Sequence, residues 1–257
     1  MRGKTRLISS NGRQVTKIYV KIYLMSWNKG FTKETHPGVR RISETMKRKK
    51  LDNFKEWREK MRAIGRIKSH YPDFKKDEYL AELIGVVLGD GNIGKFPRAE
   101  RLIIASNSNN QGFINRYSNI VQKIFIKEPK HMRFKGSNCT RISLYENFIS
   151  KRLGIPSGNR AKINFKTPRW IIQENKFLIG FLRGLYEAEG SFCVHLPTST
   201  FKMLFSNKND SLLNAVYQGL KILGFNPHRS KYKIQLSKKD EVYVFKDLIS
   251  FRNYNKL

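Results

Sequence analysis

The stretch LIGVVLGDG, residues Leu83–Gly91, is an almost wholly apolar run that ends in one carboxylate held between two glycines. A similar stretch, LRGLYEAEG, occupies Leu182–Gly190 and also ends in an acid followed by a glycine. We interpret both apolar runs as helices, and the way they end decides the rest of the fold.

Each helix carries a stripe of very small residues. Residues four apart lie on one face of a helix. Every glycine weakens a helix by about 1 kcal/mol, so such a stripe needs a packing reason. Close backbone contact between two helices is that reason. We therefore expect the stripes to meet about a pseudo-twofold axis; they consist of Ala81, Gly85 and Gly89, and of Gly180, Gly184 and Ala188.

An acid follows each stripe directly. If the stripes touch, Asp90 and Glu189 come close together, at the helix ends where the dipole disfavours an anion. Two such carboxylates repel each other unless a cation is present. Mg²⁺ takes oxygen ligands, commonly one or two carboxylates together with waters and substrate phosphates. The pattern therefore favours metal-assisted hydrolysis of a phosphodiester.

The ends of both helices have recognisable signals. Asp77 and Asn175 stand where a side chain caps the first turn. Gly91 and Gly190 are suited to a left-handed residue at the helix C-terminus. We expect both pairs to fix the helix boundaries.

The two helices open two copies of a longer repeat, spaced about 100 residues apart. Each copy has the pattern helix, two strands, helix, two strands, helix, so the predicted class is α+β with two α-β-β-α-β-β-α repeats. We place the repeats at residues 77–155 and 175–257, joined by a polar linker at 156–174. The clearest strands are Arg101–Ser106, Thr140–Leu144, Lys202–Ser206 and Lys231–Leu236.

Asparagine-rich stretches follow a strand in each copy. Ser106–Asn110 and Ser206–Asp210 precede predicted helices. Turn and N-cap roles are what Asn and Asp favour at such places, with base reading as the alternative.

The charge of the chain is extreme. It has 51 Lys and Arg against 20 Asp and Glu, a formal charge of +31. This field indicates a polyanionic partner, nucleic acid or an anionic membrane. No apolar run reaches the length of about 18 residues needed to span a membrane, and we see no signal peptide. We expect an intracellular protein, in a microbial, phage or organellar compartment that the sequence does not specify.

The two cysteines do not form a metal-binding or redox motif. Cys139 and Cys193 lack C-x-x-C spacing, which excludes a zinc finger. We expect both thiols to be buried and unbridged in a reducing compartment.

Motifs, repeat spacing and strand–helix order together resemble the LAGLIDADG homing endonucleases, in the single-chain form with two copies. The resemblance runs from about Asp77 to the C-terminus. It implies a saddle of two sheets over the major groove of a long asymmetric DNA site, with both strands cut across the minor groove to leave 3′ overhangs. Asp90 and Glu189 would each bind metal, with main-chain ligands from Gly89 and Ala188. Mg²⁺ is the expected cofactor, Mn²⁺ would substitute, and Ca²⁺ would bind without supporting cleavage.

The same family tends to place a lysine near the start of the last helix of each repeat. In the second copy Lys239 fits this place, with Lys238 as the alternative. In the first copy the place holds Tyr145–Glu146 and no lysine. The substitutes we consider are Lys130, Lys135 and Arg141; otherwise one strand would be cut more slowly.

The first 76 residues form a basic extension with 22 of the 51 basic residues and 6 of the 20 acidic ones. Within it, WNKGFTKETHPGVRRISETMKRKK (Trp27–Lys50) resembles the nuclease-associated modular DNA-binding motif appended to homing endonucleases. We expect a turn at Gly30, a cap at Thr35 and a helix from Pro37. Its thin apolar face comprises Val39, Ile42 and Met46, and Trp57, Met61 and Ile64 would anchor a following helix or linker.

Candidate DNA contacts are basic, amide and aromatic side chains of the extension and of the strands. Phosphate contacts would supply most of the affinity. The candidates are Trp27, Asn28, Lys29, Lys33, Arg40, Arg41 and Lys47 in the extension, and Arg98, Arg101, Arg133, Arg141, Lys202, Lys231 and Lys233 in the repeats.

Two alternatives within the same fold stay open: an RNA maturase acting on its host intron, and a sequence-specific nucleic-acid binder that does not cut. The presence of both acids favours the nuclease. A His-Asn-His nuclease is disfavoured because the histidines are scattered, at His36, His70, His131, His195 and His228. No splicing-domain ends flank the repeats, which favours a free-standing, intron-encoded, monomeric enzyme.

Overall fold

The computed structural model describes residues 27–52, 54–68, 70–133, 136–158 and 163–254. The chain divides into two compact units, Met1–Ser69 and His70–Leu257, here called unit 1 and unit 2. The described part of unit 1 contains α1 (Pro37–Arg48) and α2 (Lys55–Ala63).

Unit 2 contains two copies of one topology, which confirms the predicted α-β-β-α-β-β-α repeats. Each copy builds an antiparallel four-stranded sheet, in the orders β1-β2-β4-β3 and β5-β6-β8-β7. The first copy comprises α3 (Glu78–Gly89), β1 (Gly91–Phe96), β2 (Ala99–Asn107), α4 (Gln111–Phe125), β3 (Lys130–Arg133), β4 (Cys139–Glu146) and α5 (Ile149–Leu153). The second comprises α7 (Asn175–Glu189), β5 (Gly190–His195), the 3-10 helix η2 (Leu196–Thr198), β6 (Thr200–Ser206), α8 (Asp210–Ile222), β7 (His228–Ser230), β8 (Lys233–Leu236) and α9 (Lys239–Leu248). A short helix, α6 (Arg169–Gln173), precedes α7 within the linker.

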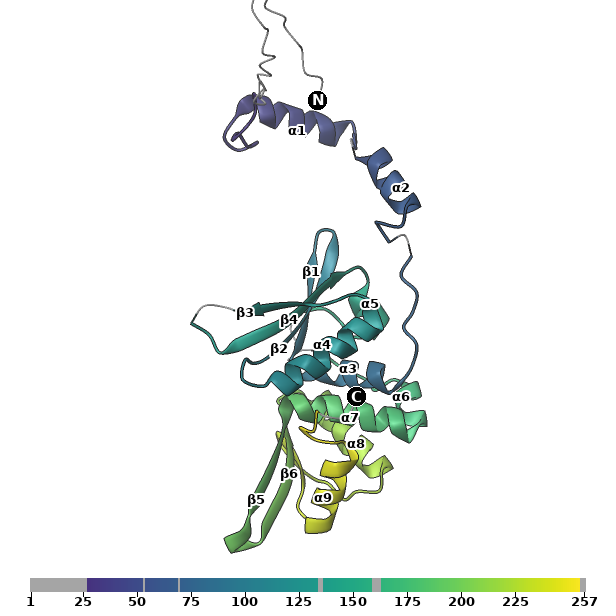
Figure 1. Cartoon of the computed structure of the whole chain (residues 1–257), viewed down its shortest axis with the longest axis vertical. Coiled ribbons are helices and arrows are strands. Elements are labelled where there is room, and N and C mark those ends of the chain that lie inside the picture. The colour runs from purple at the N-terminus through teal and green to yellow at the C-terminus, as the bar shows by residue number, and fades with distance from the viewer. Residues whose placement is uncertain (1–26, 53, 69, 134–135, 159–162, 255–257) are drawn as a thin grey trace, which may run out of the picture. The chain divides into compact units, whose positions relative to one another are not determined.

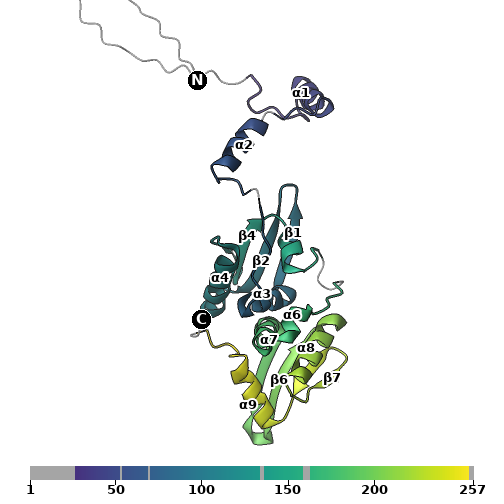
Figure 2. The ribbon, with the colours of Figure 1, turned by 90° about the vertical axis from the view of Figure 1, so that its right-hand side faces the viewer.

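Helices α3 and α7 lie side by side at the centre of unit 2, with one sheet on either side of the pair (Figures 1 and 2). Every residue of α3 from Leu80 to Gly89 is buried. An all-round apolar helix is stable only inside a core. The helix pair is therefore the shared core of the two repeats.

The small-residue stripes meet, as the sequence predicts. A β-carbon on Gly184 would stand 2.7 Å from the backbone nitrogen of Val86, and one on Gly85 would stand 2.9 Å from that of Leu185. Such distances leave no room for a side chain. The helices contact each other through their backbones at these positions.

The predicted boundary is confirmed at the start of α3, but the predicted cap of α7 and the predicted left-handed glycines after both helices are wrong. Asp77 caps α3, since its Oδ1 accepts a 2.8 Å hydrogen bond from the Leu80 N–H. Asn175 is not a cap: it is already the first residue of α7, and Glu174, the only residue between α6 and α7, takes the cap position. The prediction of left-handed glycines is also wrong. Gly190 has φ −89°, and neither it nor Gly91 lies at positive φ.

Gly91 and Gly190 are required for a different reason. A β-carbon on Gly91 would lie 2.5 Å from Cα of Val87, and one on Gly190 would lie 2.7 Å from Cδ1 of Tyr186. The chain turns from helix into strand with no intervening loop. Close approach to the preceding helical turn therefore excludes a side chain at both positions.

The asparagine-rich stretches have the expected capping role. Asn110 Oδ1 accepts from the Phe113 N–H at 3.4 Å at the start of α4. Asn209 Oδ1 accepts from the Ser211 N–H at 3.0 Å at the start of α8. Both stretches end a strand and begin a helix.

A buried ion pair ties α3 to α4. Arg116 donates two hydrogen bonds to the Glu82 carboxylate, each 2.7 Å long. Arg183 of α7 lies 3.4 Å from the same carboxylate. All three side chains are buried, so the cluster crosses the interface between the repeats with its charges desolvated.

The last described residues, 251–254, return from the second repeat to the first. The Glu187 carboxylate accepts a 2.6 Å hydrogen bond from the Tyr254 hydroxyl and another from the Arg252 N–H. The Tyr254 ring lies over Gly112 of α4, whose β-carbon would stand 2.8 Å from Cγ of the ring. Arg183 also donates a 2.8 Å hydrogen bond to the Asn253 carbonyl. This segment, the C-terminal strap, links α7 to α4.

Residues 70–76 pack against the first repeat. Arg152 donates a 2.8 Å hydrogen bond to the Pro72 carbonyl, and the Phe74 and Phe125 rings meet edge to face with centroids 4.8 Å apart. These contacts belong to unit 2.

In unit 1, α1 begins at Pro37 as predicted, and Gly30 makes its turn with φ +85°. The cap is His36 and not Thr35: His36 Nδ1 accepts from the Gly38 N–H at 3.1 Å. The Thr35 hydroxyl accepts from the Thr32 N–H within the preceding turn. Helix α2 is present, but Trp57 and Ile64 are exposed and do not anchor it.

Neither cysteine is buried, so that part of the prediction is wrong. Both thiols are free, but Cys193 is exposed and Cys139 is half-buried. Cys193 lies on the outer face of β5, opposite Lys202. Within the described residues, no helix combines the length and apolar character needed to cross a bilayer.

Candidate functional site

The two candidate acids lie at the ends of the packed helices. Asp90 is the C-cap of α3 and Glu189 is the last residue of α7. A β-carbon on Gly89 would overlap the β-carbon of Ala188 and lie 3.4 Å from Cγ of Glu189. Because Asp90 directly follows Gly89, the contact between the stripes brings the two acids to one junction, where both helices turn into their sheets.

A side chain that the sequence analysis did not assign orients one of the acids. Asn207 Nδ2 donates a 3.3 Å hydrogen bond to Glu189 Oε1. The asparagine is itself held, since its Oδ1 accepts from the Asn209 N–H at 2.8 Å and its own N–H donates to the Tyr232 carbonyl at 3.0 Å. Such outer partners fix the direction of a ligating carboxylate. The recurring Ser-Asn pair at the end of β2 and β6 was the sequence signal for it.

Strand pairing shows that the two repeats differ by one residue at this place. Gly91 pairs with Ile104, and Gly190 pairs with Phe205. Counted from these pairs, Ser106 and not Asn107 corresponds to Asn207. The aligned Ser-Asn motifs are therefore offset, and the surroundings of the two acids are not identical.

The donor set at this junction fits a hard divalent cation. Its side-chain ligands would be two carboxylates, and the helix-terminal carbonyls of Gly89 and Ala188 have no partner within their own helices. Among the described residues, no group of three or more His, Cys, Asp or Glu could hold a metal ion. Oxygen-only coordination completed by water and phosphate is typical of Mg²⁺.

The catalytic assignment of Lys239 is not supported by its position. The Lys239 ammonium lies over the Phe201 ring, 5.4 Å from its centroid. Phe201 pairs with Val194, four residues along β5 from Gly190, which corresponds to about 13 Å of strand. Lys238 is engaged with Glu241 at 3.5 Å. Both lysines lie at the far end of the β5–β6 hairpin from Glu189.

Two other basic residues occupy equivalent places beside the acids. Arg141 pairs with Ala105, whose N–H donates to the Asp90 carbonyl at 3.4 Å. Lys233 pairs with Ser206, the residue after the partner of Gly190. Of the substitutes considered for the first repeat, Arg141 is thus the one next to Asp90. Lys130 is two pairs further along β4, and Lys135 lies outside the described residues.

The strand candidates divide between two faces of the sheets. Side chains alternate along a strand, and Leu102, Ile104, Met203 and Phe205 face the core. Arg101, Arg141, Lys202 and Lys233 therefore lie on the outer faces, away from the helices. Arg98 lies in the β1–β2 turn and Lys231 between β7 and β8. Arg133 is the exception, because it pairs with buried Thr140 and lies on the helix side of an edge strand.

The candidates in unit 1 lie in the turn before α1 and along α1 itself, with Lys47 in its last turn. Trp27 is exposed and its ring meets the His36 ring edge to face, with centroids 5.7 Å apart. Lys33 and Arg40 have acidic neighbours, Glu34 at 3.4 Å and Glu44 at 3.0 Å. The other candidates, Asn28, Lys29, Arg41 and Lys47, are exposed.

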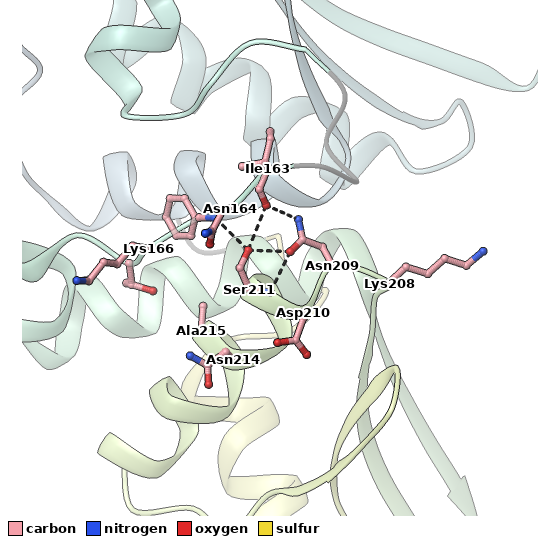
Figure 3. A pocket seen from close by; sticks show the side chains of 11 residues that line it. Ile163, Asn164, Lys166, Lys208, Asn209, Asp210, Ser211, Asn214 and Ala215 are labelled. Carbon is pink, nitrogen blue, oxygen red and sulfur yellow. Dashed lines mark hydrogen bonds between the residues drawn. The ribbon is translucent and has the colours of Figure 1, made fainter.

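A groove of about 690 Å³ lies between the linker and the start of α8 (Figure 3). Asn209 and Ser211 point toward the Ile163 carbonyl and donate to it at 2.7 and 3.2 Å. The Phe165 N–H donates to the Ser211 hydroxyl at 3.0 Å. These groups are bonded to one another and hold the linker on α8. Lys208 extends away from the groove.

Comparisons with known proteins agree with this geometry. Residues 176–255 match the family described as the LAGLIDADG-like domain. The match covers the second repeat, and the first repeat of unit 2 has the same topology.

Three relatives illustrate the similarity. The chain is 29% identical over 157 residues to the replication factor C small subunit of Methanocaldococcus jannaschii, a match over 55% of this chain and 8% of that protein. The crystal structure of full-length DUF199/WhiA from Thermotoga maritima matches with TM-score 0.50 and 16% identity, over 72% of this chain and 59% of that one. The crystal structure of I-DmoI in complex with DNA and Mn has TM-score 0.47 and 19% identity, over 67% of this chain and 96% of that one.

Proposed function

We propose that this protein is a site-specific endonuclease that cuts both strands of a long, asymmetric DNA site. The observation that carries the proposal is the backbone contact between α3 and α7, which places Glu189 against Gly89 and so beside Asp90. The formal charge of +31 supports a polyanionic substrate. The LAGLIDADG-like match of the second repeat supports the same reading.

Asp90 and Glu189 would hold a divalent cation, with the Gly89 and Ala188 carbonyls as main-chain ligands. When bound, Mg²⁺ would stabilise charge on a phosphoryl oxygen and acidify a water. We propose Mg²⁺, with Mn²⁺ able to substitute and Ca²⁺ supporting binding alone.

The other residues of the junction would orient a carboxylate or neutralise phosphate charge. Asn207 holds the Glu189 carboxylate in one direction through its amide N–H. Arg141 and Lys233, at equivalent places beside the two acids, would contact the phosphates that flank the cleavage point. Cations next to a phosphodiester stabilise the charge that develops in its transition state. This assignment takes the place of Lys239.

Unit 1 is proposed as a second DNA-binding module. Helix α1 has no buried residue and a basic last turn of Lys47 and Arg48. A helix of this composition gains most from phosphates. Its candidate contacts are Trp27, Asn28, Lys29, Lys33, Arg40, Arg41 and Lys47.

The test is cleavage of a random duplex library with Mg²⁺, followed by sequencing of the cut ends. Asp90→Asn and Glu189→Gln are each expected to slow cleavage at least about 100-fold, because a direct metal ligand should matter no less than an outer one. Binding of the selected site with Ca²⁺ should persist. Asp240→Asn, an exposed carboxylate at the start of α9, is the matched control and should cut normally.

Three outcomes oppose the proposal. Full cleavage by Asp90→Asn would refute the metal assignment. If the wild-type protein binds one duplex sequence and never cuts it, the protein is a sequence-specific nucleic-acid binder without nuclease activity. Preference for a structured intron RNA over every duplex would establish the maturase.

A further inference from the structure

We propose that Arg101 reads a guanine base in the half-site facing the first repeat, and that Phe96 and Tyr145 hold its guanidinium in the reading position. The inference rests on the proposed function to the extent that duplex DNA lies on the outer faces of the sheets. It assigns sequence recognition to one side chain and places it in one half of the site.

Three neighbouring strands build the arrangement. Arg101 in β2 pairs with Gly94 in β1 and with Tyr145 in β4, and Phe96 is two residues from Gly94 on the same face. Diagonal neighbours on a sheet face are within reach of long and aromatic side chains.

The guanidinium is held from two sides. Arg101 NH1 donates a 3.2 Å hydrogen bond to the Tyr145 hydroxyl. Its Cζ lies 5.0 Å from the Phe96 ring centroid and 5.7 Å from that of Tyr145. The two rings meet edge to face, with centroids 5.6 Å apart. The charge is therefore restrained in both position and plane.

The arrangement of Arg101 between Phe96 and Tyr145 contributes little to the stability of the fold. Both aromatic side chains are 44% exposed, and a cation–π contact at an exposed site contributes little to stability. Arg101 Nε is buried and has no hydrogen-bond partner among the described residues. A buried donor without a partner costs free energy. The cluster thus keeps an arginine in one orientation without a matching gain in stability.

A fixed, planar fork is the geometry that guanine recognition requires. Arginine pairs with O6 and N7 of guanine through two N–H groups in the major groove. With Nε buried and one NH1 hydrogen on Tyr145, the terminal edge of the guanidinium is left to face the groove. Restraining a long side chain in advance lowers the entropy cost of the contact. A phosphate contact needs no such alignment.

The second repeat lacks the arrangement. By strand pairing, Lys202 takes the place of Arg101, with Cys193 opposite in place of Gly94. The described residues make no ring contact, ion pair or hydrogen bond with the Lys202 ammonium. A mobile point charge suits a phosphate and carries no base information. The guanine requirement should therefore be confined to one half-site.

Strand geometry places the guanine approximately. Arg101 is three residues along β2 from Ile104, the partner of Gly91 beside Asp90. Three residues span about 10 Å of strand, which corresponds to roughly three base pairs at 3.4 Å each. We expect the guanine about three base pairs outward from the position nearest Asp90.

The experiment is selection of bound duplexes from a randomised library at fixed salt with Ca²⁺, using wild type, Arg101→Ala, Arg101→Lys, Tyr145→Phe and Lys202→Ala. Wild type should require guanine at one position of one half-site. Both Arg101 variants should lose that preference, with affinity for the guanine site falling roughly 5- to 150-fold. Tyr145→Phe should weaken the preference for guanine at that position. Lys202→Ala should lower affinity for all sequences alike and reduce the salt slope by about 0.9.

The outcomes separate this inference from the proposed function. If Arg101→Ala still binds duplex with the wild-type preference at every position, the Arg101 assignment is overturned and the nuclease proposal stands. If wild type selects no duplex sequence at all, both fail. Thermal melting checks the fold of each variant, and Arg101→Lys and Tyr145→Phe carry the test should Arg101→Ala unfold.

Discussion

The Cα atom of Gly184 lies 3.1 Å from the point where a β-carbon on Gly85 would stand. At this point α3 and α7 contact each other backbone to backbone. The acids at the helix ends inherit their positions from this contact, so stability and the geometry of the candidate site depend on the same residues.

Replacing Gly184 with Ala should destabilise unit 2. The new methyl group would overlap the Glu82 carbonyl and lie 2.7 Å from the Val86 nitrogen. Backbone atoms cannot move aside as a flexible side chain does, so we expect a loss of about 3 kcal/mol, the upper end of the usual range for overpacking. Urea unfolding measures it. Gly94→Ala is the control, because its nearest neighbour would be 3.5 Å away; an equal loss there would contradict the argument.

Replacing Glu82 with Gln should leave the buried Arg116 guanidinium without its counter-charge. Removing one partner of a buried ion pair costs about 3–5 kcal/mol. The double variant Glu82→Met with Arg116→Met removes both charges of this pair, while the third charge, Arg183, keeps Glu187 as a nearby carboxylate. It should lose less than the single variant. Denaturant unfolding of the three proteins checks the order. A double variant less stable than Glu82→Gln would show that the pair is net stabilising.

The stability of the C-terminal strap should depend on pH. Burial raises the pKa of Glu187 above 4.5, opposed in part by hydrogen bonds from Tyr254 and Arg252. Between the unfolded and the folded pKa, the folded protein binds more protons, so its stability falls as the pH rises. This contribution is complete below pH 4.5 and is lost as the pH rises through the folded pKa of Glu187.

The measurement is the free energy of unfolding of wild type relative to Glu187→Gln, followed from pH 4.5 to 7. The difference should decrease with rising pH. Tyr254→Phe removes a hydrogen bond that lowers the pKa of Glu187, so it should shift the decrease to higher pH. A difference that grows with pH would reverse the assigned direction of the pKa shift.

Asn207→Ala should weaken metal binding at the acid pair. Loss of an outer partner of a ligand typically costs 10- to 100-fold. Affinity for Mn²⁺ is measured by calorimetry without DNA, and nicking is scored on each strand separately, with one strand expected to be cut more slowly. Lys239→Ala, in α9 beside the far end of the β5–β6 hairpin, should change neither the Mn²⁺ affinity nor the nicking of either strand. A large effect of Lys239→Ala on nicking would restore that lysine to the site.

Removing residues 1–69 should weaken DNA binding and make it less salt-dependent. Unit 1 is a separate compact unit, so unit 2 keeps its core. Each lost phosphate contact lowers the slope of log affinity against log salt by about 0.9. Filter binding at several salt concentrations gives this slope. An unchanged slope would remove unit 1 from the DNA interface.

The helix pair and its acids were predictable because a stripe of small residues four apart has one physical explanation, close helix contact. The repeat order followed from patterns that occur twice. The predicted cap at Asn175 is wrong because α6 ends immediately before α7, so that Glu174 takes the cap position; no local signal shows this. Motif similarity alone equates Asn107 with Asn207, but strand pairing shifts the two by one residue. Arg141 and Lys233 could be placed beside the acids only once cross-strand partners were known.

The strap has a consequence for the order in which the molecule is completed during synthesis. Tyr254 covers Gly112 of the first repeat, yet it emerges from the ribosome only after the whole second repeat. Domains generally form from the N-terminus as they are translated, so the nascent first repeat waits with that surface of α4 uncovered and with α3 lacking α7. The surface of α4 around Gly112 is thus covered by a segment made after the second repeat. Translation arrested before α7 emerges would leave the apolar helix α3 exposed for chaperones to recognise.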